Sequence, residues 1–506
     1  MFEEGEKGVG KKSKGVLVIA VACCLLAALP FLVVKFPPLT DLPQHVAQVR
    51  LFADAVSNPA SPYRIQWITP YSLVYAVLGA AWLVFGPMNA GRTGMLVIAM
   101  LWIIMIYLLV SQRKRPLLAA CLASIFFFGH ILYWGFYQFA FGWPLFIGWL
   151  LLTQLDIRTR WKELLLFFAA SVVLYMAHIF WFLLAVGWLV LRHFIFKGDL
   201  KKLLLRLAAS APLLFLGIAW YPSLAAYGFQ SQTVWLTTPF ERLLPSWIID
   251  ASLGGLRGSM EPIFFAVLAG WAVIACLQNR KSLLAKMDKE LLLLAALLLV
   301  MALIFPDKQT NTMRFCQRWV PPAFAFLLLS LPEPRVRKSV LSVVVIAVVA
   351  AFFALTSWHW VIFESNEMSG LEESLQALPE APRVLGLSYI RESGVVKGRP
   401  FIQVFAYSQV LRGGELNFSF ADFGPSLVVY RERRKIPWTS ALEWLPQMAR
   451  KSDFQYFDYA LINADEKLHT DLSSEPILKP VTGPGRWRLY KISPNLSFSG
   501  IPEAKR

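Results

Sequence analysis

The sequence predicts a mainly α-helical fold: a polytopic transmembrane bundle of about eleven crossings and one outer surface helix, followed by a soluble α/β domain at the C-terminal end. Hydrophobic residues make up 57% of the 506 residues, whereas soluble globular chains contain about 45–50%. Runs of roughly 16–22 apolar residues recur before Trp360, and each can cross a hydrocarbon core of about 30 Å. Beyond residue 360 the composition is that of a soluble protein.

The net charge of +17 resides almost entirely in the membrane part. After residue 360 there are 18 Lys and Arg against 17 Asp and Glu, so the C-terminal domain is nearly neutral. Before it, Lys and Arg occur in short clusters between the apolar runs, as in the cytoplasmic loops of membrane proteins. A basic chain can indicate nucleic-acid binding, but this distribution argues against it, and we expect no nucleic-acid partner.

The basic clusters fix the predicted orientation, because such clusters face the cytoplasm. An odd number of crossings follows, with the N-terminus inside and the C-terminal domain outside. The first apolar run is about 20 residues long without a small-residue cleavage site, so we expect a retained helix rather than a signal peptide. The predicted crossings are roughly 15–34, 94–111, 117–133, 138–155, 163–178, 180–195, 203–221, 261–278, 290–306, 319–332 and 339–360.

Residues 71–85 form one further apolar stretch. If it crossed, the basic clusters at 113–115 and 158–162 would face outward, so we place it as a helix on or in the outer membrane surface. The alternative is that it crosses and another short segment does not. The predicted domains are a cytoplasmic tail (1–14), a transmembrane domain (15–360) with an outer loop (35–93), and an extracytoplasmic domain (361–506).

The C-terminal domain is predicted to be α/β. It contains none of the five cysteines, no phosphate-binding loop, no nucleophile elbow and no metal-ligand spacing. We therefore interpret it as a lid, a docking module or a stabilising cap. Strands are expected at 382–387, 401–405, 426–430 and 457–463, a helix at 439–450, and a closing hairpin at 477–492.

Candidate catalytic residues follow the first crossing directly. Asp41 and His45 are four residues apart and share a face if the chain becomes helical near Pro43. A carboxylate just above the bilayer can take a proton from an acceptor hydroxyl, and a histidine can assist. The alternative is that Thr40 or Asp41 only caps a short helix.

The last predicted outer loop supplies candidate phosphate contacts. Arg314 and Arg318 are four residues apart, and arginine binds phosphate through paired hydrogen bonds. Lys308 lies in the same loop. The competing interpretation is that the arginines are snorkelling anchors at the membrane edge.

Three further residues are candidate substrate contacts. His178 ends a predicted crossing, and an ionisable group inside a membrane is by default a functional hypothesis; a small shift of the boundary would make it an ordinary interfacial histidine. Gln138 and Arg50 also lie on the predicted outer side, although a lone Gln often only bonds a neighbouring helix. The aromatic turn at 133–137 fits an interfacial belt or a sugar-stacking surface.

The order of these parts resembles the GT-C membrane glycosyltransferases. It is most similar to the bacterial polyprenyl-phosphate-sugar-dependent transferases of the aminoarabinose transferase and protein mannosyltransferase type. The resemblance covers roughly residues 15–335 and rests on organisation more than on tight motifs. An acidic residue follows the first helix, and Phe85-Gly86 and then Arg92 lead into the second crossing.

An uncharacterised subgroup of that family matches more closely. Its Asp-x-Pro-x-His form is matched by Asp41, Pro43 and His45. Its aromatic glycine-bounded turn is matched by residues 135–142, and its Tyr-x-x-His motif by Tyr175 and His178.

The resemblance implies a bacterial inner (plasma) membrane protein that transfers a hexose or pentose from a polyprenyl-phosphate donor, among membrane lipids, to an unknown glycan, lipid or protein acceptor. It makes Asp41 the candidate base or acceptor-orienting acid, and Arg314 and Arg318 the candidate phosphate contacts. Many relatives carry a second acidic residue where this chain has Leu42. Asp41 therefore acts alone, His45 substitutes for the missing acid, or catalysis has been lost. Because the sequence shows no acidic cluster, we expect no metal and no cofactor.

Two other functions remain open at this stage. A non-catalytic partner of an envelope-assembly complex would use the outer domain for docking and would copurify with another protein. A transporter would show mid-membrane polar groups, broken helices or an internal repeat. We find no repeat, and the polar groups gather at one predicted face.

Overall fold

The computed structural model describes residues 3–222, 232–310 and 312–493, with side chains from residue 15 onward. The chain forms two compact units, which are described separately. The first comprises Met1–Leu32, Leu96–Leu132 and Phe136–Ser357, and the second comprises Val33–Met95, Tyr133–Gly135 and Trp358–Arg506.

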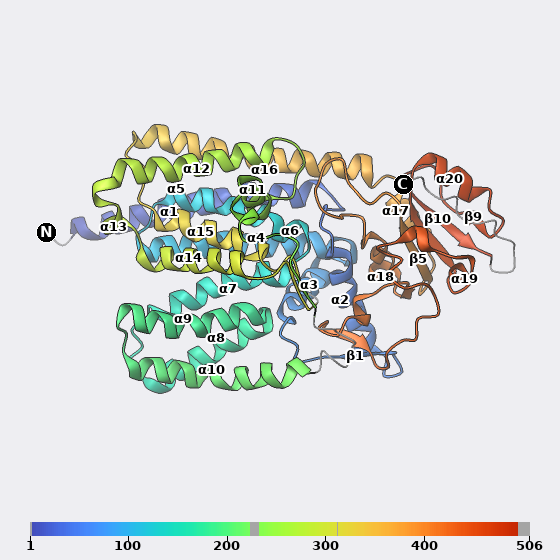
Figure 1. Cartoon of the computed structure of the whole chain (residues 1–506), viewed down its shortest axis with the longest axis horizontal. Helices are drawn as coiled ribbons and strands as arrows, with labels where there is room; N and C mark the ends of the chain where they lie inside the picture. Colours follow the sequence, from blue (N-terminus) through green and yellow to red (C-terminus); the bar gives the residue numbers. More distant parts are fainter. Residues whose placement is uncertain (1–2, 223–231, 311, 494–506) are drawn as a thin grey trace. The chain divides into compact units, whose positions relative to one another are not determined.

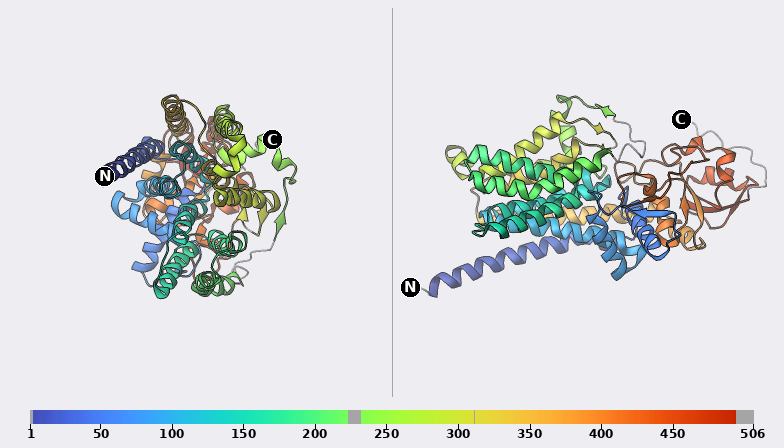
Figure 2. Two further views of the ribbon diagram at one scale, coloured as in Figure 1. Left: turned by 90° about the vertical axis from the view of Figure 1, so that its left-hand side faces the viewer. Right: turned by 90° about the horizontal axis from the view of Figure 1, so that it is seen from below.

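Helices make up most of the first unit (Figure 1). A chain in lipid must satisfy its backbone N–H and C=O groups internally, so long apolar runs fold as helices. Figure 2 shows the long helices of this unit running side by side. Four of the helices, α1, α4, α6 and α16, continue into the second unit. The helices are α1 (Glu3–Val33), α4 (Pro87–Arg113), α5 (Leu117–Ala123), α6 (His130–Tyr133), α7 (Tyr137–Thr153), α8 (Arg160–Ala177), α9 (Ile179–Phe196), α10 (Leu200–Trp220), α11 (Pro245–Leu253), α12 (Met260–Asn279), α13 (Leu283–Lys286), α14 (Lys289–Ile304), α15 (Val320–Ser330) and α16 (Lys338–Glu367).

Short segments complete this unit between the helices. The 3-10 turns are η1 (Ser124–Phe128), η3 (Glu241–Leu243), η4 (Arg280–Ser282) and η5 (Gln317–Trp319), and the strands are β2 (Thr233–Val234), β3 (Lys308–Gln309) and β4 (Thr312–Met313). The three strands form one small sheet in the order β2-β3-β4.

Among the described residues, six helical segments are long and apolar enough to cross a membrane. They are Gly15–Val33, Pro87–Arg113, Ile179–Phe196, Leu200–Trp220, Met260–Lys286 and Lys338–Glu367. The chain is therefore a multi-pass membrane protein. The other five predicted crossings coincide with shorter or less apolar helices; α15 has 11 residues, or about 17 Å of helix. The total of eleven crossings stays a prediction.

Aromatic rings fill the interior of the first unit. Trp102 on α4 and Trp143 on α7 have ring centroids 3.9 Å apart. Trp181 on α9 packs against Phe146 on α7 with centroids 5.2 Å apart. All four side chains are at most 1% exposed. Large buried rings remove much apolar area from their surroundings, so these contacts join α4, α7 and α9.

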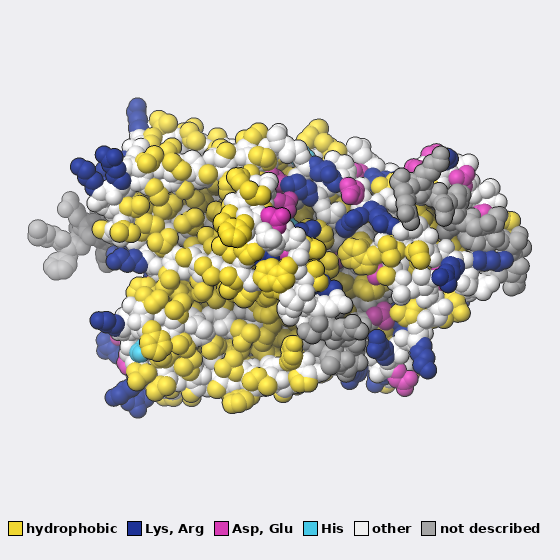
Figure 3. Space-filling view, viewed as in Figure 1, with side chains coloured by type: hydrophobic (Ala, Val, Ile, Leu, Met, Phe, Trp, Pro, Cys, Tyr) yellow, Lys and Arg dark blue, Asp and Glu magenta, His cyan; other side chains and the backbone are white. Residues whose placement is uncertain are grey.

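Charged side chains inside this unit are paired. Arg206 on α10 donates to Glu163 on α8 at 2.7 Å, and the two side chains are 7% and 4% exposed. Arg113 and Arg192 both donate to Glu290 near the start of α14, which ties α4 and α9 to α14. Pairing offsets the cost of removing charge from water. Figure 3 shows Lys and Arg side chains gathered at the end of these helices near α13, the distribution from which the cytoplasmic side was predicted.

A five-stranded sheet organises the second unit, in the order β6-β5-β8-β10-β9. Its strands are β5 (Arg383–Ser388), β6 (Glu415–Leu416), β8 (Tyr459–Asn463), β9 (Leu478–Pro480) and β10 (Trp487–Ile492). β5 pairs in parallel with β6 and β8, whereas β10 is antiparallel to β8 and β9. The predicted closing hairpin is therefore confirmed. The remaining elements are α2 (Leu42–Ser57), β1 (Tyr63–Ile65), α3 (Leu73–Phe85), α17 (Leu371–Gln376), η6 (Val404–Ala406), α18 (Tyr407–Arg412), η7 (Phe420–Asp422), β7 (Val428–Tyr430), η8 (Pro446–Met448), α19 (Lys451–Phe454) and α20 (Glu466–Ser473).

Helix α2, from the first outer loop, is built into this unit. Gln44 donates to Gln403 Oε1 at 2.9 Å and accepts from the Phe420 N–H at 3.0 Å. Gln48 exchanges two hydrogen bonds with the backbone of Val428, at 2.8 and 3.1 Å. β1 also pairs antiparallel with β7. The segment predicted as the first outer loop thus folds together with the C-terminal part of the chain. Helix α16 runs through the domain boundary predicted at residue 360, and this boundary stays a prediction.

Helix α3 is the apolar stretch that we placed on the outer surface. It has 13 residues, or about 20 Å of helix, and is by itself too short to cross a core of about 30 Å. Its length agrees with that placement, which stays a prediction.

Two predicted elements of the C-terminal part are wrong. Residues 439–450 are not an α-helix and contain only the turn η8. Ala441 has a φ of 61°, and Pro446 lacks an N–H and disfavours helical geometry at the residue before it. Residues 401–405 are a buried turn that leads into η6 rather than a strand, because a short, mostly apolar run does not reveal its own period.

The close packing at Gly386 gives the first testable prediction. A Cβ atom at this position in β5 would overlap the buried ring of Phe405. We predict that Gly386→Ala lowers the free energy of unfolding by about 1–3 kcal/mol through overpacking, measured as a lower melting temperature in detergent. The matched control is Gly79→Ala in α3, where nothing lies within 4 Å of the new Cβ and alanine favours the helix. Equal melting temperatures for the two variants would contradict this packing.

Candidate functional site

The residues predicted to form a site fall into two groups, one in each compact unit. Asp41, His45 and Arg50 belong to the second unit, whereas Gln138, His178, Lys308, Arg314 and Arg318 belong to the first. Each group is described within its own unit.

Asp41 stands at the N-cap position of α2, directly after the first crossing. Its backbone carbonyl accepts the His45 N–H at 3.1 Å, but its carboxylate makes no capping hydrogen bond to the helix. The side chain therefore does not act as the helix cap that the sequence left open. Thr40, the residue before Asp41, is held in place because its N–H and its hydroxyl both donate to Tyr133 O, at 3.2 and 2.9 Å. A Cβ at Gly135, whose φ is 90°, would lie 2.6 Å from Asp41 Cβ, so only glycine fits this turn.

His45 lies one turn further along α2 and is 4% exposed. Its Nδ1 is 3.0 Å from the Tyr75 hydroxyl, and its ring packs edge-on against Phe420 with centroids 5.1 Å apart. Burial lowers the pKa of His45 to about 3, and a hydrogen bond to the backbone of Gly135 opposes this shift only in part. The ring is therefore neutral at physiological pH. It accepts from Tyr75 while it donates to the Gly135 carbonyl, and so it supports the turn against Asp41.

Arg50 lies further along the same helix, about two and a half turns beyond Asp41. Its Nε donates to Asp54 Oδ1 at 3.2 Å, one turn ahead. A Cβ at Gly413 would lie 3.3 Å from the Arg50 guanidinium, which shows how closely the backbone approaches it. Arg50 thus braces the outer end of α2 and is not brought to the Asp41 end.

Arg318 is the most constrained of the predicted phosphate contacts. Its guanidinium carbon lies 3.6 Å from the ring centroid of Phe136, and two of its nitrogens donate to Met313 O at 3.1 and 2.7 Å. The residue is only 8% exposed. A guanidinium held between an aromatic face and a carbonyl keeps its charge and is fixed in direction. The head group of a snorkelling anchor would instead reach water.

Arg314 and Lys308 lie on the hairpin formed by β3 and β4. Lys308 Nζ is 3.3 Å from Gln232 Oε1. Arg314 follows β4 with a left-handed φ of 52° and donates to Gln317 Oε1 at 3.4 Å. For a residue other than glycine, the left-handed backbone conformation costs on the order of 1–3 kcal/mol and persists only where the surrounding structure holds it. Arg314 thus directly follows the hairpin, and Arg318 lies four residues further along the chain, in η5.

His178 caps helix α9. Its Nδ1 accepts from the Phe180 N–H at 3.2 Å, and its ring stands edge-on to Phe139 with centroids 5.2 Å apart. It is 3% exposed and close enough to Arg318 for that charge to act on it. Gln138 is half-buried beside Phe139 on α7. The fold thus brings His178 and Arg318 to the start of α7, the helix turn that also carries Gln138.

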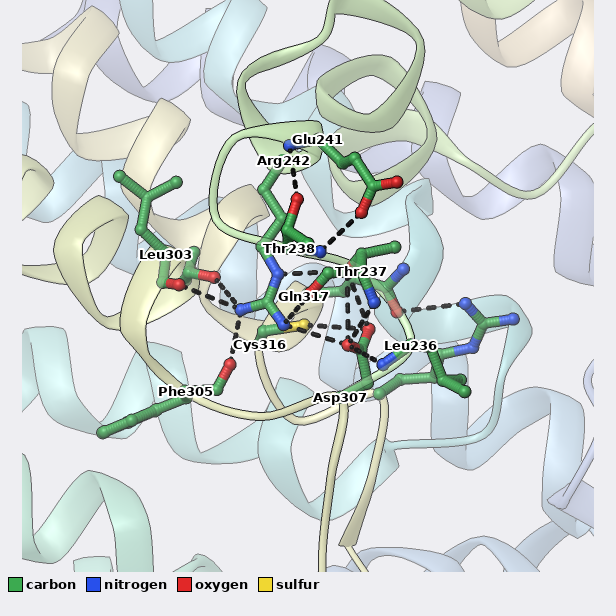
Figure 4. Close-up of polar contacts among 12 residues, drawn as sticks. Leu236, Thr237, Thr238, Glu241, Arg242, Leu303, Phe305, Asp307, Cys316 and Gln317 are labelled. Carbon is green, nitrogen blue, oxygen red and sulfur yellow. Dashed lines mark hydrogen bonds and ion pairs between the residues drawn. The ribbon is translucent and has the colours of Figure 1, made fainter. Parts of the chain in front are cut away.

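A buried ion pair beside this group was not singled out in the sequence (Figure 4). Arg242 donates to Asp307 at 2.9 Å, with side chains 0% and 3% exposed. Arg242 also donates to backbone carbonyls at the end of α14, and Asp307 accepts from the backbone N–H groups of Leu236 and Thr237 at 2.9 and 3.1 Å. The two partners are 65 positions apart in the sequence, and no local pattern connects them.

The charge state of Asp307 follows from these contacts. Burial alone raises its pKa, but the two backbone N–H donors and the Arg242 charge outweigh burial and lower the pKa overall. The carboxylate is therefore ionised, and the pair fastens the segment around η3 to the loop that carries Lys308 and Arg314.

The two groups offer different chemistry. The second unit presents one carboxylate, Asp41, on a turn supported by a neutral histidine, which suits an acceptor hydroxyl. The first unit presents two arginines at a rigid hairpin, which suits a phosphate. Within the described ranges, no three His, Cys, Asp or Glu side chains come together as metal ligands would.

The buried His45 makes the stability of the protein pH-dependent. Its pKa of about 3 in the folded protein is below the value of about 6.5 for an unfolded histidine, so the unfolded chain takes up a proton first as the pH falls. The stabilisation is complete above about pH 7 and is lost as the pH falls from about 6.5 toward 3. We expect this residue alone to lower the free energy of unfolding by about 2 kcal/mol at pH 5 relative to pH 7.5.

The measurement compares the melting temperatures of the wild type and His45→Asn in detergent at pH 7.5 and pH 5. Asparagine keeps a polar group at the position without a titrating ring, so the variant should lose less stability on acidification. An identical pH dependence in both proteins would show that His45 is not the group responsible.

The Arg242–Asp307 pair gives a prediction about stability. Arg242→Met leaves a buried carboxylate without its arginine partner and should lower the free energy of unfolding by about 3–5 kcal/mol. The double variant Arg242→Met/Asp307→Asn removes that uncompensated charge and should melt at a higher temperature than the single variant. Arg158→Met, at an exposed arginine, is the control for loss of one charge. A double variant no more stable than the single one would argue against the pair.

Comparison with known proteins supports the fold through structure rather than sequence. A scan against models of protein families finds no match, and neither does a search of the curated proteins. Among solved structures, ArnT from Cupriavidus metallidurans bound to undecaprenyl phosphate matches with a TM-score of 0.54 over 94% of this chain and 98% of that chain, at 12% identity.

Arabinofuranosyltransferase AftD from Mycobacteria also matches, with a TM-score of 0.51 at 14% identity. The alignment covers 95% of this chain but 40% of AftD, so this chain spans about two-fifths of that larger protein. Both similar proteins are GT-C fold membrane glycosyltransferases. The chain therefore shares the GT-C fold of these two proteins, as the order of parts in its sequence predicted.

Proposed function

We propose that this protein is a membrane glycosyltransferase that moves a sugar, a hexose or pentose, from a polyprenyl-phosphate-linked donor to a cell-envelope acceptor. The observation that carries the proposal is the likeness in fold, over nearly the whole of both chains, to ArnT bound to undecaprenyl phosphate. The proposed setting is the outer face of a bacterial inner membrane, with the N-terminus in the cytoplasm.

The proposed reaction is an inverting displacement. An acceptor hydroxyl oxygen attacks the anomeric carbon of the sugar while the bond from that carbon to the phosphate oxygen breaks. Polyprenyl phosphate leaves with the bonding electron pair, and the hydroxyl proton passes to a base. Because a phosphate leaves readily once its charge is balanced, the chemistry needs fixed cations more than a strong acid.

Asp41 is the proposed base, or the acid that orients the acceptor. Two features support this role: its place directly after the first crossing, and the tight Gly135 turn against its side chain. Leu42 occupies the position of a second acid and is fully buried, so Asp41 has the role alone. His45 is neutral and already engaged with Tyr75 and Gly135, and we assign it a positioning role rather than proton transfer.

Arg314 and Arg318 are the proposed contacts to the donor phosphate, with Lys308 on the same hairpin adding charge. The fixed guanidinium of Arg318 and the held backbone of Arg314 support this assignment, because a preoriented donor loses little entropy when it binds phosphate. His178 and Gln138, close to Arg318 at the start of α7, are proposed as contacts to the donor sugar.

The role of Asp41 is tested with an Asp41→Asn variant reconstituted in lipid nanodiscs. Synthetic polyprenyl-phosphate pentoses and hexoses are supplied together with bacterial envelope fractions, and release of polyprenyl phosphate is followed by mass spectrometry. A general base typically contributes about 10²–10⁴-fold, so the turnover of Asp41→Asn should fall at least about 100-fold. Binding of undecaprenyl phosphate should not change.

The control is Asp465→Asn, the same substitution at another N-cap aspartate of the second unit, where the carboxylate does cap its helix. It should retain full turnover. Wild-type turnover by Asp41→Asn would remove Asp41 from the mechanism. If the wild type releases no polyprenyl phosphate from any donor and instead copurifies with another envelope protein, the chain is a non-catalytic partner of an assembly complex.

A further inference from the structure

A groove of about 1120 Å³ opens on the second unit, away from the residues assigned above. Its walls come from the β1 end of the first outer loop (59–63), the turn at 414–415 and the segment 430–435. We propose that this groove binds an anionic glycan, a chain of sugars bearing carboxylate or phosphate groups, as the acceptor. The claim that the glycan is the acceptor rests on the proposed transferase function. The claim that the groove binds an anionic glycan rests on the groove alone.

The segment along the groove carries an excess of positive charge. Residues 431–435 read Arg-Glu-Arg-Arg-Lys, four cations against one carboxylate. Three of these cations, Arg431, Arg433 and Lys435, are exposed in the groove wall. No carboxylate of the described residues forms an ion pair with Arg433 or Lys435. Cations without a carboxylate partner are available to an incoming anion.

Arg431 and Arg434 are the fixed members of this segment. Arg431 donates to the backbone carbonyls of Ser61 and Pro59, at 2.9 and 3.3 Å. Its charge is thus held at the groove, and no carboxylate in the described part of the chain forms an ion pair with it. Arg434 donates to Asp422 at 2.9 Å and lies 4.3 Å from the centroid of the Tyr430 ring. The exposed cations are thus mounted on a rigid support, and rigid support lowers the entropic cost of binding.

The other walls of the groove fit a sugar chain better than a lipid or a flat surface. Tyr63 and Tyr430 pair across the β1–β7 ladder with ring centroids 4.9 Å apart and both line the groove. The lining includes both carboxylates and guanidinium groups, which suits hydroxyls that both donate and accept hydrogen bonds. An alkyl chain would gain little from such a polar lining, and a concave site does not match a planar membrane.

The test measures binding by the full-length protein in detergent, without any donor. The probes are oligogalacturonate, which carries carboxylates, a glycerol-phosphate oligomer, which carries phosphates, and a neutral dextran oligomer of similar length. We expect at least one anionic probe to bind, with an affinity that falls as the salt concentration is raised. The neutral dextran should not bind. Which anionic probe binds more tightly identifies the charged group on the glycan.

The decisive variant is Arg433→Glu/Lys435→Glu, which should weaken binding of the anionic probe at least tenfold. Its matched control is Lys479→Glu/Lys491→Glu, the same charge change at two exposed lysines paired across β9 and β10 in the same unit, which should change binding less than twofold. Melting temperatures establish that both variants are folded. Equal weakening by both pairs, or no binding of either anionic probe to the wild type, overturns the proposal.

Two further measurements separate this inference from the proposed function. The Arg433→Glu/Lys435→Glu variant should still bind undecaprenyl phosphate, so its loss of transfer would be specific to the acceptor. If the wild type binds the anionic probe but cleaves no donor, the groove stands as a glycan site and the transferase function fails. If vesicles of anionic lipid displace the bound probe, the groove is a membrane contact and the glycan proposal fails.

Discussion

Two buried glutamines hold α2 to the C-terminal part of the chain, and the architecture of the second unit depends on them. Gln44 and Gln48 are both 0% exposed, and each uses its amide as donor and acceptor toward groups more than 350 positions away. A buried amide left unpaired costs about 1–3 kcal/mol, so these bonds fix the rotation and register of the helix. Because α2 begins at Leu42, the same register sets where Asp41 stands and which side of the helix buries His45.

The first unit uses buried charge for a comparable purpose. Arg242 with Asp307 and Arg206 with Glu163 each join elements that are distant in sequence. Such pairs add little net stability compared with apolar packing, but breaking one is costly, so they discriminate strongly against other arrangements. The Arg242 pair also explains how Arg314 keeps a left-handed backbone, since the loop that carries it is fastened at Asp307. Rigid loops that present cations are what binding of a phosphate group requires.

The sequence predicted the general architecture well and the individual contacts poorly. The apolar runs located the helices, and the closing hairpin of the C-terminal part was recognised from its strands and turn. The helix expected at 439–450 failed because Ala441 and Pro446 impose backbone angles that the apolar spacing does not reveal. Asp41 was identified as a candidate, but the sequence left a capping role open, and only the geometry of its side chain decided against capping.

What the sequence determined by itself is the class of the protein: a helical, multi-pass membrane chain with a nearly neutral C-terminal α/β part. Hydropathy, run length and the placement of charge are local properties, and a lipid environment acts on them directly. What only the tertiary structure decided is the state of each candidate residue. His45 is neutral because it is buried beside Tyr75 and Phe420, and neither residue is near it in sequence. A pKa and a hydrogen bond depend on what surrounds a group in space, and that information exists only once the chain has folded.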